Sequence, residues 1–380
     1  MITGKIGLQI KNGDEVISDS VLSGDDEGNV HVEDDHHAPS AVDGKYAGYE
    51  IKDGGIKGTN KKLTRIEIPD GVTSIDDSAF EDYKSLTEVI VPASVRYIGN
   101  SAFSGCVKLA KINIPEGVTH ISSFAFSGCK ALTAITLPES VTWIGMYAFN
   151  DCIKLAAINI HEYITQIFSG AFQNCAALTR IDLPDGLDKI NSNLFDGCKK
   201  LETVTIPETV TSIGSNAFNG CKKLKGIVIP TTVDEIGRFA FNECQSLTQI
   251  EIPEGVETLE DLTFSDCTGL TSVTLPSSLT VMEDYVFHGC KNLRKISIPS
   301  GIEKMGDGVF GGCEKLTEIT LPADMTAISD DLFKDCTGLI KVVIPSSITT
   351  IGTCAFAGCS NLTTISIPKL SSMICLLASI

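Results

Sequence analysis

The stretch Leu86-Thr-Glu-Val89-Ile-Val91-Pro92-Ala-Ser-Val95-Arg-Tyr-Ile98-Gly-Asn-Ser-Ala102-Phe103-Ser-Gly-Cys106 decides the fold, because its pattern recurs every 23 residues. The constant positions read L-x-x-[IV]-x-[ILV]-P-x-x-[VIL]-x-x-[ILM]-x-x-x-A-F-x-x-C. Thirteen prolines, thirteen phenylalanines and twelve cysteines keep this period, and His161 stands where one proline is missing. One inserted residue would move all later positions out of line, so a register without a slip predicts a stack of equivalent rungs. The chain is therefore predicted to be a solenoid.

Each rung is predicted to begin with a strand. Val89 and Val91 alternate with variable neighbours, as in a half-buried strand. Pro92 cannot donate a ladder hydrogen bond, so the strand ends there. The apolar residues after the proline recur at spacings of three and four, which favours a second bend or a short helical turn. No rung can bury its apolar side chains alone, so stacking of the rungs is the expected folding mechanism.

The L-x-x-I-x-I-P strand and the A-F-x-x-C-x-x-L join to the next copy resemble the leucine-rich repeats, specifically the BspA-like class, from Leu63 to about Pro368. The resemblance implies an α/β-type repeat solenoid, right-handed, with a curved parallel β-sheet and about 13–14 rungs. Each rung would hold a strand and a short turn or helical segment. Members of this class are mostly adhesins or recognition proteins of bacterial and protozoan surfaces. The resemblance therefore implies recognition or adhesion at a cell surface or outside the cell.

Three segments are predicted: an irregular acidic N-terminal cap with short strands over residues 1–61, the repeats over 62–368, and a degenerate C-terminal end over 369–380. A terminal rung needs a cover, because it exposes the core and an unpaired strand edge. Lys5–Ile10 and Asn29–Val32 alternate enough to form strands of such a cap. The histidines and acids of residues 31–37 form either a solvated loop or a divalent-cation site. The last residues, Met373–Ile380, form either a hydrophobic plug or a truncated end.

Composition narrows the choice of partners and location. The formal net charge of −18 argues against nucleic acid or an anionic membrane as the main partner. No run of 18 apolar residues occurs, so membrane insertion is not expected. The opening Met1-Ile-Thr-Gly-Lys lacks the apolar core of a signal peptide. Either a leader has been removed or the protein is cytoplasmic, which is the alternative location.

Twelve of the fourteen cysteines occupy equivalent positions on successive rungs. Their side chains would run parallel at one strand spacing, about 4.8 Å. A disulfide needs Cβ atoms closer than that, about 3.8 Å apart. The pattern predicts a buried ladder of thiols, with Cys354 and Cys375 outside the ladder and more reactive. No C-x-x-C spacing occurs, and neither a metal site nor a cofactor is predicted.

Three positions per rung are predicted to face outward from the strand. These positions vary, as expected of a binding surface on a fixed scaffold, although any solvated sheet is also variable. The basic residues among them are predicted to bind a partner, namely Arg65, Lys111, Arg180, Lys295 and Lys341. An acidic row follows the prolines and serves solubility or, as an alternative, collects Ca²⁺. Its members are Asp70, Glu116, Glu139, Glu162, Asp185, Glu208 and Glu254.

The least ordinary feature of the sequence is aromatic. Tyr97, His120 and Trp143 stand one period apart and are expected to stack along one face. Tyr147 and Tyr163, with Phe124, Met146 and Phe168, take positions that other rungs give to Ser, Asn or Asp. Aromatic residues gathered at exposed positions are typical of interface hot spots. The sequence predicts a contact patch for a protein or glycan ligand here, with local packing as the alternative.

Motifs of enzymes are missing from the sequence, which has no G-x-S-x-G, H-E-x-x-H or Walker loop. The histidines are scattered, and His161 is the one departure from the period inside the repeats. The prediction is a non-enzymatic recognition or adhesion protein that binds its partner through the solenoid surface. An intracellular protein-interaction scaffold is the alternative. The oligomeric state is not encoded in any pattern of the sequence.

Overall fold

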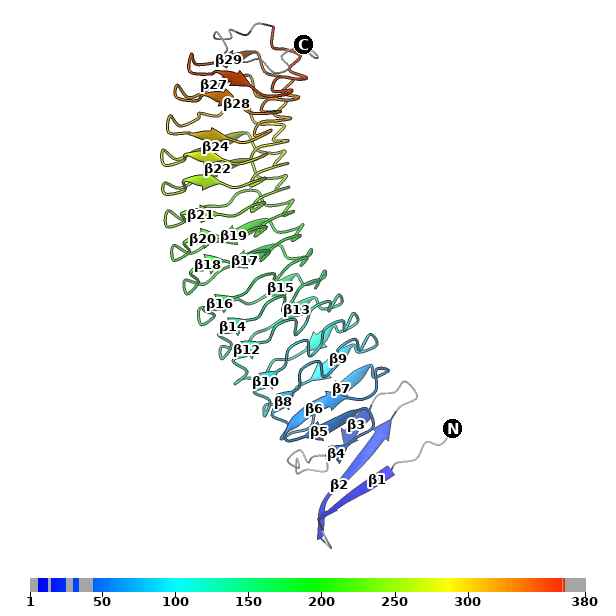
Figure 1. The fold of residues 1–380 in the computed structure, drawn as a ribbon. Helices are drawn as coiled ribbons and strands as arrows, with labels where there is room; N and C mark the ends of the chain where they lie inside the picture. The colour runs from blue at the N-terminus through cyan, green and yellow to red at the C-terminus, as the bar shows by residue number, and fades with distance from the viewer. Residues whose placement is uncertain (1–5, 13–14, 25–29, 34–43, 364, 366–380) are drawn as a thin grey trace. The chain divides into compact units, whose positions relative to one another are not determined.

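The computed structural model of the protein describes residues 6–12, 15–24, 30–33, 44–363 and 365. By packing, the chain divides into two compact units, Met1–Ala177 and Leu178–Ile380. Within each unit, 23-residue rungs are stacked so that equivalent residues of successive rungs lie side by side (Figure 1). The predicted repeat solenoid is confirmed as a stack of parallel strands.

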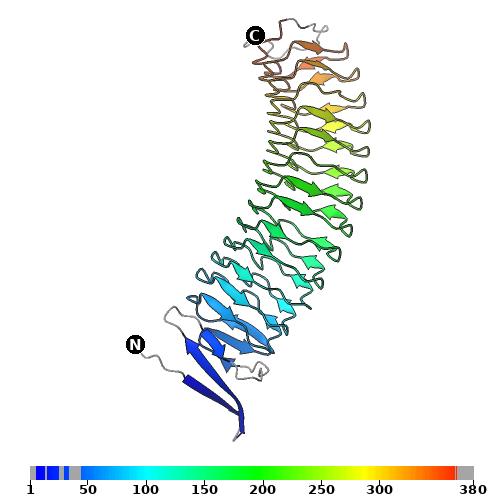
Figure 2. The same cartoon turned by 180° about the vertical axis from the view of Figure 1, so that it is seen from behind.

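Most rungs contribute two short strands, one on either side of the proline bend, whereas residues 225–229 and 294–298 form no strand before theirs (Figure 2). The first row runs parallel and in register, with Glu88 opposite Lys111 and Val89 opposite Ile112. In Met1–Ala177 its strands are β7 (Arg65–Glu67), β9 (Glu88–Ile90), β11 (Lys111–Ile112), β13 (Ala134–Ile135) and β15 (Ala157–Ile158). In Leu178–Ile380 they are β17 (Arg180–Asp182), β19 (Thr203–Thr205), β22 (Gln249–Glu251), β24 (Ser272–Thr274), β27 (Glu318–Thr320) and β29 (Lys341–Val343).

The second strand row was not predicted as a strand. In the first unit it consists of β8 (Ser74–Ile75), β10 (Tyr97–Ile98), β12 (His120–Ile121), β14 (Trp143–Ile144) and β16 (Gln166–Ile167). In the second unit it consists of β18 (Lys189–Ile190), β20 (Ser212–Ile213), β21 (Glu235–Ile236), β23 (Thr258–Leu259), β25 (Val281–Met282), β26 (Lys304–Met305), β28 (Ala327–Ile328) and β30 (Thr350–Ile351). The expected single parallel sheet is thus replaced by two rows of short strands.

The expected helical segment after the proline bend was wrong, because none of the described residues is helical. The reason lies in where the backbone N–H groups donate. The N–H of Ser101 donates to Ser123 O at 2.9 Å, and that of Phe103 donates to Ala125 O at 2.8 Å, both in the next rung. A helix would direct them to its own carbonyls four residues earlier. Pairing between rungs therefore replaces the helix, and turns fill the remainder of the rung.

Two ladders of identical side chains fill the core. The rings of Phe80 to Phe172 stack in the first unit with centroids 5.4–5.8 Å apart, and those of Phe195 to Phe356 in the second unit 5.2–6.0 Å apart. The predicted thiol ladder is buried as expected. Thiols of the ladder donate hydrogen bonds to backbone carbonyls of the preceding rung, as Cys129 Sγ does to Phe103 O at 3.3 Å. Burial of these ladders against neighbouring rungs is what holds the stack together.

The first unit begins with antiparallel strands. β1 (Ile6–Asn12), β2 (Glu15–Gly24) and β3 (Val30–Glu33) form one meander. β4 (Gly44–Lys45), β5 (Tyr49–Lys52) and β6 (Gly55–Gly58) form a second one, whose last strand pairs in parallel with β8. This pairing occupies the edge of the first rung. Residues 34–37 and the C-terminal residues Met373–Ile380, including Cys375, lie outside the described residues, so the predictions made for them stay predictions.

Candidate functional site

The aromatic residues singled out in the sequence lie on the second strand row. In β10, β12 and β14 the isoleucine points into the core, and the residue before it faces outward. Strand alternation therefore places Tyr97, His120 and Trp143 on the outer side. The parallel register sets His120 opposite Trp143.

Trp143 is the centre of this group. The ring of His120 meets it edge-on with centroids 5.3 Å apart, and the ring of Phe168 does so at 5.1 Å. Edge-to-face contacts of this kind are favourable because of the ring quadrupole. Tyr97 is held differently, since its hydroxyl donates to Asp77 Oδ1 at 3.1 Å. Of the expected row of Tyr97, His120 and Trp143, the last two are in ring contact, Phe168 adds a third ring, and Tyr97 bonds to a carboxylate.

A second aromatic pair lies in the turn that follows these strands. The rings of Phe124 and Tyr147 stack with centroids 5.1 Å apart and an interplanar angle of 20°. Both residues have a left-handed backbone, with φ of 58° and 53°. Ser78 and Ser101 take the same position in earlier rungs. A bulky side chain is unusual at positive φ and stores strain, and such positions are often functional.

The two groups come from successive rungs, and the N–H of Phe124 donates to Met146 O at 2.9 Å in the next rung. We define the aromatic surface as His120, Phe124, Trp143, Met146, Tyr147 and Phe168. Phe124 is 41% exposed and Met146 is 44% exposed. Tyr163, also predicted to belong here, lies beside His161 with ring centroids 5.9 Å apart. The aromatic surface offers an apolar platform of the kind found at binding hot spots.

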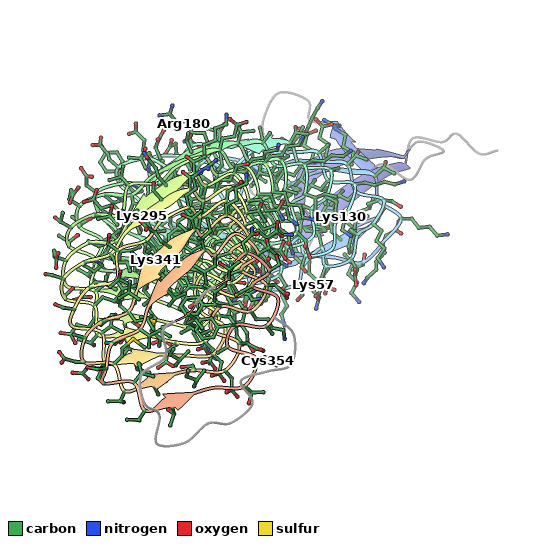
Figure 3. All side chains as sticks on the ribbon, turned by 90° about the horizontal axis from the view of Figure 1, so that it is seen from above. Lys57, Lys130, Arg180, Lys295, Lys341 and Cys354 are labelled. Atoms are coloured by element: carbon green, nitrogen blue, oxygen red, sulfur yellow. The ribbon has the colours of Figure 1, made fainter. Side chains whose placement is uncertain are left out.

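The basic residues predicted on the first strand row are largely paired with acids. Arg65 Nε lies 3.0 Å from Glu88 Oε2, and Arg180 donates to both oxygens of Asp182 at 3.0 and 3.1 Å. Hydrogen bonds from Arg180 lower the pKa of Asp182. Lys111 and Lys295 lie 4.0 and 3.8 Å from Glu88 and Glu318, and Lys341 faces Glu318 across the strand register. In Figure 3, Lys295 and Lys341 lie apart from Cys354. Exposed ion pairs of this kind contribute little to the stability of the fold. The role of these basic residues in binding a partner stays a prediction.

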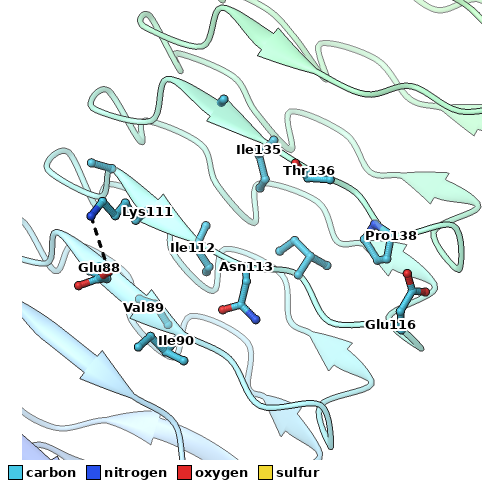
Figure 4. Close-up of a pocket in the computed structure, with 13 residues that line it drawn as sticks. Glu88, Val89, Ile90, Lys111, Ile112, Asn113, Glu116, Ile135, Thr136 and Pro138 are labelled. Atoms are coloured by element: carbon cyan, nitrogen blue, oxygen red, sulfur yellow. Dashed lines mark ion pairs between the residues drawn. The ribbon is translucent and has the colours of Figure 1, made fainter.

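The same strand row carries a shallow groove of about 560 Å³ across β9, β11 and β13 (Figure 4). Ile90, Ile112 and Ile135 are among the apolar residues that line it, and Glu88 and Lys111 add charge. The sequence analysis did not predict this groove. The shape of the groove depends on the side chains that line it, and these vary from rung to rung.

The groove also contains Asn113, whose role the sequence analysis missed. Its Oδ1 accepts from Val91 N–H at 2.8 Å, and its Nδ2 donates to Val91 O at 2.7 Å. Asn159 bonds to Leu137 in the same way at 2.7 and 2.8 Å. The amide thus substitutes for a strand hydrogen bond in rungs where the strand has only two residues. The sequence did contain a signal for this role, namely an asparagine at a position that faces outward from the strand.

Glu254, a member of the acidic row after the prolines, forms hydrogen bonds with the next rung. Its carboxylate accepts from the N–H and Oγ of Ser277, both at 3.0 Å, and these bonds lower its pKa. Among the described residues, no group of three His, Cys, Asp or Glu side chains has the geometry to hold a metal ion.

The repeat matches a known family model. The model of the BspA type leucine-rich repeat region matches residues 58–179, 165–294, 211–340 and 282–375. The chain belongs to the BspA-type leucine-rich repeat family. This finding confirms the resemblance that the strand and join motifs indicated. A search of curated proteins found no match to the chain.

Solved structures share the fold of this BspA-type protein. A leucine-rich repeat protein from Bacteroides ovatus is 29% identical with a TM-score of 0.69, and the match covers 92% of this chain and 93% of that one. A leucine rich cell surface protein from Faecalibacterium prausnitzii is 27% identical with a TM-score of 0.52, covering 94% and 93%. A leucine-rich repeat protein from Eubacterium ventriosum is 23% identical with a TM-score of 0.50, covering 92% and 95%, and supports the fold alone. In the described part of the chain, no helix is long and apolar enough to span a membrane.

Proposed function

We propose that this BspA-type protein is a non-enzymatic recognition protein that binds a protein or glycan partner through the aromatic surface, and that it acts at a cell surface. The family is one of repeat proteins that typically lack enzymatic activity and bind other proteins. The similar Faecalibacterium prausnitzii protein is described as a cell surface protein, which supports the proposed location.

The observation that carries the proposal is the placement of Phe124 and Tyr147. Their rings are partly exposed to solvent, and their backbone is left-handed. Earlier rungs place a small serine at the equivalent position, Ser78 and Ser101. Packing of the core does not need them, because the buried ladder beneath them is complete without their rings. An aromatic pair kept at a strained, exposed position is better explained by a contact with a partner.

Trp143 gives a direct test, because it is the single tryptophan of the chain. Its emission reports on the aromatic surface once the emission of the added partner, measured alone, is subtracted. The full chain is titrated with a panel of matrix proteins and glycans, and binding is followed by this emission and by surface plasmon resonance. A partner that docks on the aromatic surface shifts or quenches the tryptophan signal with the same midpoint as the resonance signal.

Substitution provides the second arm of the test. Trp143→Ala is expected to weaken binding about 30-fold, the loss typical of a hot spot worth about 2 kcal/mol. Val281→Ala removes a side chain at the equivalent position of another rung and should leave binding unchanged. Binding that survives Trp143→Ala with full affinity contradicts the proposed site. Absence of binding to every matrix protein and glycan contradicts the proposed function.

A further inference from the structure

The second strand row of Leu178–Ile380 carries a strongly acidic stretch. Its rungs around β21, β23, β25 and β26 present carboxylates at most outward positions of the strand and the following turn. Two basic side chains accompany them, and both are already paired, Arg238 with Asp261 and Lys304 with Glu283. We define the acidic face as Asp234, Glu235, Glu257, Glu260, Asp261, Glu283, Asp284, Glu303 and Asp307.

Part of this face is a fixed column of aspartates. Oδ1 of Asp261 accepts from the N–H of Asp284 at 3.1 Å, and Oδ1 of Asp284 accepts from the N–H of Asp307 at 2.9 Å. These bonds hold one carboxylate on each successive rung and satisfy one oxygen of each. Burial and the charges of Asp284 and Asp330 raise the pKa of Asp307. Arg238 pairs with Asp261 at one end of the column, and Asp284 and Asp307 continue the row of carboxylates on the next two rungs.

A cavity of about 360 Å³ adjoins the column, between β21 and β23. Four carboxylate residues line it, namely Asp234, Glu235, Glu257 and Glu260. Glu235, Glu257 and Asp234 are exposed, so the cavity opens to solvent. A cationic group that enters it meets acceptors from two successive rungs. Charge-assisted hydrogen bonds of this kind are stronger than neutral ones.

An apolar row lies directly beside the acidic column. Phe239, Leu262 and Tyr285 have φ of 58°, 54° and 58° at the position that Asn193 and Asn216 occupy in earlier rungs of this unit. Backbone hydrogen bonds join the two rows, because the N–H of Leu262 donates to Asp284 O at 2.9 Å and that of Tyr285 to Asp307 O at 2.8 Å. Tyr285 is 36% exposed, and its ring meets that of His288 at 5.6 Å.

We propose that this face binds a lysine- or arginine-rich polypeptide segment, with its cationic groups in the carboxylate-lined cavity and over the ring of Tyr285. Carboxylates beside an exposed aromatic ring suit a cation, because the ring face attracts it as well. Nucleic acid is repelled by such a face. The aromatic surface of the first unit differs, since Phe124 and Tyr147 have Ser123 and Met146 in the neighbouring column instead of aspartates. The aromatic surface therefore lacks the carboxylate column that favours a cationic segment on the acidic face.

The test uses the full chain and fluorescein-labelled octalysine as the probe, with anisotropy measured at low salt. Saturable binding is expected. Glu235→Gln combined with Glu257→Gln should weaken it at least 10-fold, because both carboxylates line the cavity. Tyr285→Ser should weaken it about 3-fold, and the fold tolerates serine here, since Ser78 and Ser101 hold the equivalent position with φ of 54° and 55°.

A matched control removes two charges elsewhere in the same unit. Asp185→Asn combined with Glu208→Gln changes two exposed acids outside the acidic face and should alter the affinity less than 2-fold. Thermal melts followed by circular dichroism confirm that each variant is folded. Equal weakening by the control, or no binding of octalysine, overturns the proposal. Calcium binding measured by calorimetry without octalysine binding also overturns it. Trp143→Ala should leave octalysine binding unchanged, which separates this proposal from the proposed function.

Discussion

The ring of Tyr147 lies across Gly170, which occupies the equivalent position of the next rung. A Cβ built on Gly170 would come 2.3 Å from Cε1 of Tyr147. The second unit repeats the relationship, because a Cβ on Gly308 would come 2.5 Å from Cε1 of Tyr285. Both glycines have positive φ, at 65° and 59°. In each unit a tyrosine at the left-handed position is thus followed by a glycine, whose missing Cβ leaves room for the ring.

This relationship predicts a coupling between the two residues. Gly170→Ala should destabilise the protein by about 2–4 kcal/mol, because alanine is strained at positive φ and displaces the Tyr147 ring. In a Tyr147→Ser background the same change should cost at least about 1 kcal/mol less. Urea unfolding of the four proteins in the cycle measures this. Gly226→Ala is the control, since nothing lies within 4 Å of a Cβ there. Additive effects would show that the ring does not require the glycine.

Asn113 is predicted to stabilise its rung through its side-chain amide. Asn113→Ala leaves the N–H and the carbonyl of Val91 without their partner, so we expect a loss of about 1–3 kcal/mol in the free energy of unfolding. Thr136→Ala changes the equivalent position one rung later, where the side chain is exposed, and should cost less than about 0.5 kcal/mol. Denaturant titration compares the two. Equal losses would mean that the amide bonds to Val91 contribute nothing specific.

Cys354 is predicted to be the reactive thiol among the described cysteines. It is exposed, whereas the ladder thiols are buried, and burial raises the pKa of Cys106 and Cys267 to about 12. A thiol must ionise to react with a disulfide reagent. In a Cys375→Ser background, a colorimetric thiol assay at pH 7.5 should therefore release one equivalent quickly and the remainder after unfolding. Rapid release of several equivalents would contradict a sealed ladder.

The ladder also predicts that stability falls in alkaline solution. The folded pKa of Cys267 is about 12, above the value near 8.5 of an unfolded thiol. The unfolded chain therefore loses its protons first as the pH rises. The stabilisation is complete below about pH 8.5 and is lost as the pH approaches 12, by about 1.4 kcal/mol per pH unit for each such thiol. Urea unfolding at pH 7.5, 8.5 and 9.5 checks this, and Cys267→Ala should show a smaller slope than the parent protein. A stability that is flat or rises over this range would refute the assignment.

The sequence by itself determined the repeat and the direction of its constant side chains. A period of 23 residues without a slip leaves stacking as the means to bury the phenylalanine and cysteine positions, and it places Tyr97, His120 and Trp143 at equivalent variable positions of successive rungs. The variable positions also predicted the aromatic contact patch, although Tyr97 bonds to Asp77 and Tyr163 lies beside His161, and the binding role of the patch stays a prediction.

Only the tertiary structure decided the backbone of the second half of each rung. Spacings of three and four suit a helical turn as well as a bend, and the choice depends on hydrogen-bond partners in the next rung, as for Ser101 and Ser123. The sign of φ at Phe124, Tyr147 and Tyr285 was likewise hidden, because aromatic residues do not signal a left-handed backbone. The acidic face depends on the same turns. Carboxylates one period apart become a column only when successive rungs are in register and bonded to each other, as Asp261 and Asp284 are.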